Sequence, residues 1–184
     1  WSSDVCSSDL ERIVMEAFET VKIDAFMENP FTLIGKQWML ITAEKDGKVN
    51  TMTASWGGLG EIWEQSAAYI VVRPQRYTKE FLDAADTFSL TFFEESYRKT
   101  LSYLGTVSGR EEDKIAKSGL TIAHCGDTPY FEEAEKVLIC KKAFAQPMVE
   151  QSFLDRALIE KWYEEKDYHI LYIGLVEKVM YRQK

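Results

Sequence analysis

The sequence predicts a mainly β fold, in which an antiparallel barrel closes on itself and helices pack on its outside. Strand-like segments outnumber helical ones along the 184 residues, and no strand-helix-strand rhythm repeats as a parallel sheet would require. The strands are short and joined by hairpins or single helices, and closure into a barrel removes exposed sheet edges. The chain is 46% hydrophobic, which is enough for one domain with its own core.

The first half of the chain is rich in predicted strands. The expected elements are a strand over 18–23, a helical turn ending at Asn29 and Pro30, strands over 31–43, 50–58 and 67–73, and a helix over 78–86. Asp46 and Gly47 are typical of a hairpin turn between the second and third strands. Pro74 ends the fourth strand, and Thr78 is the expected N-cap of the helix.

The second half mixes strands and short helices. The expected elements are a strand over 87–93, helices over 94–105 and 110–119, a strand over 136–146, a helix over 152–163 and a strand over 168–181. Tyr97, Leu101 and Leu104 recur with helical spacing, and Gly105 is expected to end that helix.

The first residues resemble a foreign sequence. Residues 1–10, "WSSDVCSSDL", are serine-rich and have neither helical nor strand periodicity, and residues 4–10 match the conceptual translation of a sequencing-adapter oligonucleotide. We therefore interpret residues 1–14 as a non-native segment and expect the domain to span 15–184, with Met15 as the true start. The alternative is a natural disordered tail.

Charge and motif content exclude several classes of function. With 22 basic and 30 acidic residues, the formal charge of −8 argues against nucleic acid as a partner. No apolar run approaches the roughly 20 residues that span a bilayer, so we expect a soluble, cytoplasmic protein without a membrane partner. Three cysteines without C-x-x-C spacing and two histidines predict no metal site and no catalytic triad. Dinucleotide and P-loop glycine motifs are also absent from the sequence.

The stretch "NTMTASWGG", residues 50–58, would place hydroxyl side chains on one face of a strand and apolar side chains on the other. In a strand, the hydroxyls of Thr51, Thr53 and Ser55 share one face. The opposite face carries Met52, Ala54 and Trp56. The hydroxyl face is either solvated or the wall of a polar ligand site, which the following Gly-Gly would let a ligand approach closely.

Two clusters of positive charge are candidate anion sites. In "VRPQRYT", Arg73 and Arg76 precede the start of a predicted helix near Thr78, and guanidinium groups and helix N-termini both bind phosphate. The alternative is that both arginines are solvated or pair with neighbours such as Glu80 and Asp83.

The stretch "SGREEDK" repeats the pattern, because Arg110 and Lys114 flank another loop-to-helix junction. The alternative for this second cluster is an ordinary charged helix capped by Ser108.

Aromatic residues extend the candidate site. Trp38 and Trp56 belong to two strands that we expect to pair, and they could stack on a flat ligand, although tryptophan more often fills a core. His169 shares a strand face with apolar residues, which favours a satisfied core histidine. Together the clusters suit an aromatic, phosphorylated ligand such as FMN, without selecting it over other phosphorylated heterocycles.

Six blocks of sequence, taken in order, carry a resemblance to a known family. The blocks are "NPFTLIGKQWMLITA", "NTMTASWGG", "VRPQRYTKEFL", "TFSLTFF", "SGREEDK" and "PYFEEAEKVLICKK". The chain from about residue 18 to residue 181 resembles the flavin reductase-like family of FMN-binding split-barrel proteins, particularly its flavoredoxin-like branch. The resemblance implies a split β-barrel and a homodimer that binds FMN non-covalently near the subunit interface.

The resemblance also implies roles for particular residues. The strand that begins at Asn50 would line the flavin ring, and the backbone of Thr51, Met52, Thr53 and Ala54 would meet its polar edge. Ser55 and Trp56 would continue this wall, whereas Arg73, Arg76 and Thr78 would lie on the ribityl-phosphate side. The blocks that contain Asn29, Trp38, Arg110 and Lys114 would approach the ring or the phosphate.

The implied function is that of an NAD(P)H-dependent flavin reductase, in which FMN passes electrons to a flavin, a protein or another acceptor. No side chain needs to act as a catalytic nucleophile, because the cofactor supplies the chemistry. One alternative is a flavoredoxin-like electron carrier between protein partners that does not use NAD(P)H efficiently. Another alternative is a ligand-binding barrel without catalytic activity.

Overall fold

The computed structural model describes residues 17–183. The interpretation of residues 1–14 as a non-native segment therefore lies outside the described residues. No helix in the described part of the chain combines the length and the apolar character needed to cross a bilayer.

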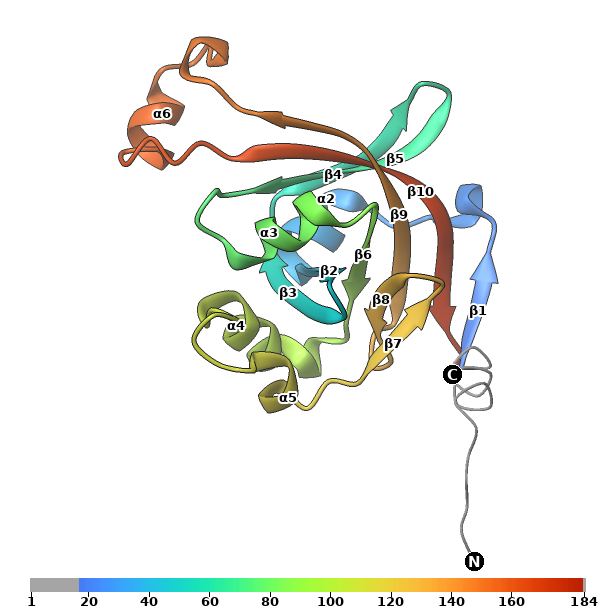
Figure 1. The fold of residues 1–184 in the computed structure, drawn as a ribbon. Coiled ribbons are helices and arrows are strands. Elements are labelled where there is room, and N and C mark those ends of the chain that lie inside the picture. Colours follow the sequence, from blue (N-terminus) through green and yellow to red (C-terminus); the bar gives the residue numbers. More distant parts are fainter. Residues whose placement is uncertain (1–16, 184) are drawn as a thin grey trace, which may run out of the picture.

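A single antiparallel sheet of eight strands forms most of the molecule (Figure 1), so the mainly β prediction is confirmed. The main path runs β3-β2-β6-β9-β10-β5-β4, and β1 pairs with β10 beside this path. The strands are β1 (Phe18–Val21), β2 (Met39–Lys45), β3 (Lys48–Ala54), β4 (Gly57–Ile62), β5 (Gln65–Val72), β6 (Thr87–Phe92), β9 (Lys136–Pro147) and β10 (Ile170–Arg182). A separate hairpin of β7 (Ile122–Cys125) and β8 (Thr128–Phe131) was not predicted.

The barrel is split between β3 and β4. Within residues 17–183, β3 pairs with β2 alone and β4 with β5 alone, so the fully closed barrel expected from strand pattern is wrong at this point. The predicted single strand over 50–58 breaks at Ser55 and Trp56, where the chain passes from one part of the sheet to the other. Gly57 has φ 150°, and a Cβ there would lie 2.4 Å from the carbonyl oxygen of Tyr69. A side chain is therefore excluded at this corner.

The segment before β2 is helical, and its prediction as a strand over 31–43 is wrong in the first part. α2 (Pro30–Thr32) continues into the π-helical turn η2 (Leu33–Gln37), and the strand begins only at Met39. Asn29 caps this helix, because its side-chain oxygen accepts a hydrogen bond from the Phe31 backbone N–H at 3.0 Å. The Asn-Pro pair is a helix-start signal that outweighs the β-like composition after it.

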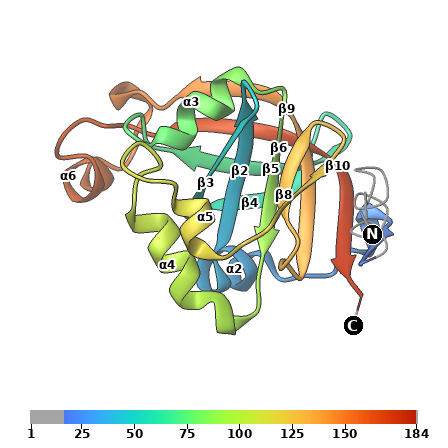
Figure 2. The ribbon, with the colours of Figure 1, turned by 60° about the horizontal axis from the view of Figure 1, so that its bottom comes forward.

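The other helices are short and lie outside the barrel. They are α3 (Tyr77–Ala84), α4 (Arg98–Thr106), α5 (Lys114–Ser118) and α6 (Ala157–Trp162), with 3-10 turns η1 (Ile23–Ala25), η3 (Glu95–Tyr97) and η4 (Glu150–Ser152). Gly105 lies within α4 and does not end it, but η3 and α4 together match the predicted helix over 94–105 to within one residue. Asp113 caps α5, so the predicted helix over 110–119 is too long. Figure 2 shows α4 and α5 beside β3 and β2.

Two apolar clusters make up the core. The first fills the barrel between β2, β5, β6 and β10, and includes Met39, Ile70 and Phe88. The second lies between the outer face of the sheet, α4, α5 and the β7–β8 hairpin, and includes Leu40, Leu104 and Tyr130. The second cluster fixes α4 against β3, and this contact positions the site described next.

Candidate functional site

Two small cavities adjoin each other where β3, β5, α3 and α4 meet. The aromatic cavity, of about 230 Å³, is lined mainly by β3, Trp56, Trp162 and His169. The basic cavity, of about 220 Å³, is lined by residues 75–78, residues 106–109 and Lys114. Met52, Arg73 and Arg76 line both, so the two cavities form one elongated site.

The hydroxyls of β3 are occupied by the protein itself. Thr51 Oγ1 donates to the carbonyl of Ile41 at 3.1 Å and shares a hydrogen bond with Thr42. Thr53 Oγ1 donates to the carbonyl of Leu101 in α4 at 2.5 Å. These two hydroxyls are therefore neither solvated nor free to form a ligand wall, and they attach β3 to its neighbours.

What β3 offers the aromatic cavity is its unpaired edge and one side chain. An edge strand directs every second backbone N–H and C=O away from its only partner. Met52 lines both cavities, and Thr53, Ala54, Ser55 and Trp56 line the aromatic one. Gly105 of α4 packs so closely on β3 that a Cβ there would lie 3.0 Å from Thr53 Cβ. This contact holds the edge of β3 in place.

Asn50 connects β3 to the start of α3. Its Nδ2 donates to Thr78 Oγ1 at 2.9 Å, and both side chains are buried. Thr78 is the second residue of α3 and Arg76 takes the N-cap position, so the prediction of Thr78 as N-cap is wrong. The Thr78 hydroxyl accepts this internal bond and keeps its own proton, so it can donate to an anion together with the first-turn backbone N–H groups of α3.

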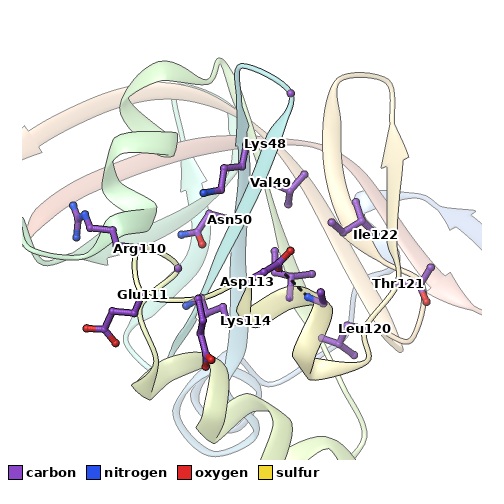
Figure 3. Close-up of a pocket in the computed structure, with 15 residues that line it drawn as sticks. Lys48, Val49, Asn50, Arg110, Glu111, Asp113, Lys114, Leu120, Thr121 and Ile122 are labelled. Atoms are coloured by element: carbon purple, nitrogen blue, oxygen red, sulfur yellow. Dashed lines mark hydrogen bonds between the residues drawn. The ribbon is translucent and has the colours of Figure 1, made fainter.

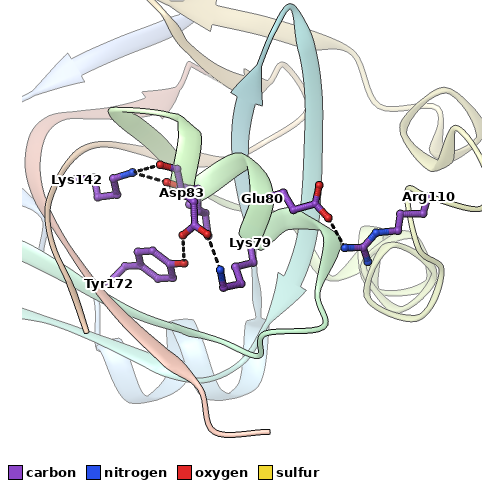
Figure 4. A network of polar contacts seen from close by, with 7 residues as sticks. Lys79, Glu80, Asp83, Arg110, Lys142 and Tyr172 are labelled. Carbon is purple, nitrogen blue, oxygen red and sulfur yellow. Dashed lines mark hydrogen bonds and ion pairs between the residues drawn. The ribbon is translucent and has the colours of Figure 1, made fainter. Parts of the chain in front are cut away.

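A polar network fixes the other end of α3 (Figure 4). The Asp83 carboxylate accepts hydrogen bonds from the Tyr172 hydroxyl of β10 at 2.6 Å and from Lys79. Lys142 of β9 donates to the backbone carbonyls of Leu82 and Asp83. Hydrogen bonds from Lys79 and Tyr172 hold the pKa of Asp83 below its usual value although burial acts in the opposite direction. The N-terminus of α3 is thus held at a fixed position relative to the sheet.

Arg76 and Lys114 are two neighbouring cations held by backbone carbonyls. Arg76 Nη1 donates to the Gly105 carbonyl at 2.8 Å, and Lys114 Nζ donates to those of Leu104 at 2.8 Å and Val107 at 3.0 Å. Within residues 17–183, neither cation forms an ion pair with a carboxylate. Burial, and then the charge of Arg76, lower the pKa of Lys114 to about 8. The basic cavity therefore carries uncompensated positive charge in a chain of net charge −8.

Arg73 has a different set of partners. Its guanidinium pairs with the Asp167 carboxylate through Nη1 and donates through Nη2 to the Trp162 carbonyl at 2.8 Å. Gln75 donates to the same carboxylate at 2.7 Å, and the bonds from Gln75 and Arg73 lower the pKa of Asp167. The sequence suggested that Glu80 or Asp83 could neutralise this arginine, but Asp167 does so.

Arg110 lies at a third, larger cavity. Its guanidinium pairs with Glu80 at 2.5 Å and lies over the Tyr77 ring. Glu80, which the sequence suggested as a partner of Arg73 or Arg76, therefore pairs with Arg110 instead. The cavity, of about 800 Å³, lies between the β2–β3 hairpin, the loop before α5 and the start of β7. Figure 3 shows Lys48, Asn50 and Arg110 on one side of it and Leu120 and Ile122 on the other. Glu111, Glu112 and Asp113 also line it, which makes it less suited to an anion than the basic cavity.

Asn29 and Trp38 are not brought into the elongated site. Asn29 caps α2, and Trp38 has φ 71° at the end of η2, where the Arg98 guanidinium lies 3.9 Å from its ring centroid. The strands around Trp38 and Trp56 do pair as expected, since Met39 is opposite Ala54. Both tryptophans lie just outside those strands.

The aromatic cavity contains two residues that sequence reasoning did not select. Trp162 packs edge-on against Trp56, with ring centroids 5.0 Å apart, and both indoles are about 40% exposed. His169 is buried and shares a hydrogen bond of 2.8 Å through Nδ1 with the Tyr163 hydroxyl. Burial, and then Arg73, lower the pKa of His169 to about 4, so its imidazole is neutral at pH 7. No local motif marks Trp162, because α6 reaches the cavity only through the long β9–β10 connection.

Comparison with known proteins identifies the family. The model of the flavin reductase like domain matches residues 31–184. The chain belongs to the flavin reductase-like family. This confirms the resemblance inferred from the six sequence blocks.

Solved structures agree with this flavin reductase-like fold. An FMN-binding domain of a flavin reductases-like enzyme from Shewanella baltica OS155 is 16% identical with a TM-score of 0.66, over 90% of this chain and 77% of that one. The flavoredoxin of Desulfovibrio vulgaris (Miyazaki F) is 20% identical with a TM-score of 0.63, and the match covers 90% of this chain and 78% of the flavoredoxin chain. The styrene monooxygenase flavin reductase from Pseudomonas putida S12 is 14% identical with a TM-score of 0.58, and the match covers 78% of this chain and 77% of the reductase chain. No curated protein matches the chain.

Proposed function

We propose that this flavin reductase-like protein binds FMN in the elongated site and acts as an oxidoreductase that takes electrons from NAD(P)H and passes them to a flavin, a protein or another acceptor. The observation that carries the proposal is the pair of uncompensated cations, Arg76 and Lys114, beside an aromatic cavity. FMN has a flat ring joined to a phosphate by a polyol chain. The ring suits the aromatic cavity, and the phosphate suits the adjoining basic cavity.

The residues present fit such a ligand. The basic cavity supplies two cations without a carboxylate partner, Arg76 and Lys114, and the first turn of α3, and none of its described lining residues is a carboxylate. Guanidinium, ammonium and helix N–H groups together are a favourable donor set for phosphate. The aromatic cavity supplies the edge of β3, the Met52 side chain and the Trp56 indole for the ring.

FMN, when bound, supplies a ring that accepts a hydride and releases electrons. The chain contributes orientation, electrostatics and exclusion of water. Backbone groups at the edge of β3 orient the polar side of the ring, and the indoles of Trp56 and Trp162 limit the access of water to it. The positive charge of Arg76, which lines both cavities, favours negative charge on a ligand there.

A second candidate function is that of a flavoredoxin-like carrier, which exchanges electrons with protein partners and uses NAD(P)H poorly. The partial exposure of Trp56 and Trp162 supports it, because exposed indoles at a cavity mouth are typical protein-contact residues.

We also propose a homodimer, through the sheet face opposite the barrel core. Strand alternation places Tyr69 and Val71 of β5 beside Ile173 and Leu171 of β10 on this face, and Phe144 of β9 extends it. The Tyr69 ring lies across Gly58 and Gly60 of β4, which keeps the face flat. The face continues into the aromatic cavity through Val71. A second copy packed there would border the cavity.

Anaerobic titration of the FMN-loaded protein with NADH and with NADPH tests the reductase function. We expect at least one of them to bleach the flavin absorbance. Bleaching by a chemical donor but by neither nucleotide would favour the carrier function instead. A purified protein that neither retains nor takes up FMN would contradict both.

Arg76→Ala should weaken FMN binding by roughly 10- to 100-fold, the range expected for loss of one charged hydrogen bond to phosphate. Riboflavin lacks the phosphate, so its affinity should change little. Arg110→Ala is the matched control, because it removes the same charge at the third cavity. Flavin fluorescence titration measures both ligands. Equal losses for FMN and riboflavin in Arg76→Ala would contradict phosphate recognition by this residue.

FMN affinity should fall as pH rises above about 8, because Lys114 of the free protein loses its proton there. A phosphate beside Lys114 favours the charged form, so it raises the pKa, and binding and protonation support each other. Riboflavin affinity should stay level between pH 7 and about 9. The same titrations in Lys114→Met should show no pH slope for FMN. A slope that persists in this variant would assign it to another group.

Light scattering should give twice the mass of one chain for the protein in solution, and a smaller mass for Phe144→Asp. The substituted carboxylate would be buried in the proposed interface without a partner, which is strongly unfavourable. Ile122→Asp is a matched control on a distant exposed apolar residue. A monomeric mass for the unchanged protein would refute the dimer.

A further inference from the structure

The connection between β9 and β10, residues 148–168, forms a projecting arm that carries η4 and α6. Figure 1 shows α6 standing away from the barrel at the end of the two long strands. None of the six described residues of α6 is buried, and Leu154 is 99% exposed. Apart from Tyr163, which is buried against His169, little apolar burial holds this arm in place. Such segments lie at the low-stability end of a protein.

The aromatic contacts of the arm are mostly internal. The Tyr163 ring lies 5.4 Å from Phe153 and 5.1 Å from Tyr168, centroid to centroid. At the base of the arm, the Met148 backbone N–H donates to the His169 carbonyl at 2.9 Å and continues the ladder between β9 and β10. The arm can therefore move as one body about this base.

Polar contacts with the end of β5 hold the arm over the site. Asp167 accepts hydrogen bonds from Arg73 and Gln75, and the Trp162 carbonyl accepts a second bond from Arg73. The Arg73 and Asp167 side chains are only 24% and 20% exposed, which strengthens their attraction relative to a fully solvated pair. We call these three bonds the latch.

The latch places the Trp162 indole at the mouth of the aromatic cavity. Trp162 lines this cavity together with Trp56, which it meets edge-on. Opening the latch would remove one wall of the cavity. The wall that remains, made of β3 and the end of β5, belongs to the hydrogen-bonded sheet.

We propose that the arm is a gate over the aromatic cavity, latched by Asp167, and that Trp162 determines the size of the reaction partner that reaches a ligand bound there. The part of this proposal that concerns a reaction partner rests on the proposed flavin function. The gate itself does not depend on it.

Thiol labelling tests the latch without any flavin. Ser55 lines the aromatic cavity, so Ser55→Cys reports access to it. Adding Asp167→Asn should speed labelling by a bulky polymer-maleimide about tenfold, the effect of losing one hydrogen-bonded charge pair. Labelling by small iodoacetamide should change less. Glu160→Gln removes a charge from the exposed surface of α6 and should leave both rates unchanged. Peptide mass spectrometry separates this site from the native cysteines.

Equal polymer labelling with and without Asp167→Asn would overturn the latch. Acceleration by Glu160→Gln to the same extent would also overturn it, because the effect would then come from the charge of the arm and not from this pair.

Reoxidation of the FMN-loaded, dithionite-reduced protein tests the role of Trp162. Trp162→Ala should raise the rate with cytochrome c severalfold relative to the rate with ferricyanide, since only the bulky acceptor is limited by the gate. Trp63→Ala, at the exposed turn between β4 and β5, should leave this ratio unchanged. An unchanged ratio in Trp162→Ala would refute the size selection. Failure to bind FMN would instead refute the proposed function, and the labelling result would still decide the gate.

Discussion

The C-terminal carbonyls of α4 are the contact on which the site depends. The last turn of a helix leaves carbonyl groups without helical partners and carries partial negative charge. Here the last-turn carbonyls of Leu104 and Gly105 accept hydrogen bonds from Lys114 and Arg76, and the carbonyl of Leu101, before the last turn, accepts one from Thr53. One helix end therefore attaches the edge of β3 and gathers two cations. Partial charges stabilise these cations without neutralising them, so positive charge remains for an anion.

The rest of the architecture keeps this helix end opposite the start of α3. Asn50 ties β3 to the first turn of α3, and the Asp83 network ties the last turn of α3 to β9 and β10. The positive end of one helix thus faces two cations held by the negative end of another. The second apolar cluster, packed between α4, α5 and the sheet, opposes any separation of these parts.

Sequence pattern predicted most strands of the large sheet, because alternation and turn residues are local signals. The prediction from sequence failed where contacts between distant segments determine the local structure. Residues 33–37 have strand-like composition, but the Asn29 cap starts a helix that buries Leu33 and Ile34. The hydroxyls of β3 suggested a ligand wall, whereas α4 covers that face. Trp162 and Asp167 reach the site through a connection that carries no local motif, so no pattern in the sequence could have selected them.

Arg73 and Arg76 show why spacing alone cannot assign roles. The two residues lie three positions apart, line the same two cavities and carry the same charge. Arg73 meets a carboxylate supplied by the arm, so its charge is compensated and its donors hold the arm against the end of β5. Among residues 17–183, the hydrogen-bond partner of the Arg76 guanidinium is the carbonyl of Gly105, so its positive charge acts on any ligand that enters the site. The difference lies in the partner that each guanidinium finds, and that partner is fixed by the packing of α4 and by the course of the arm.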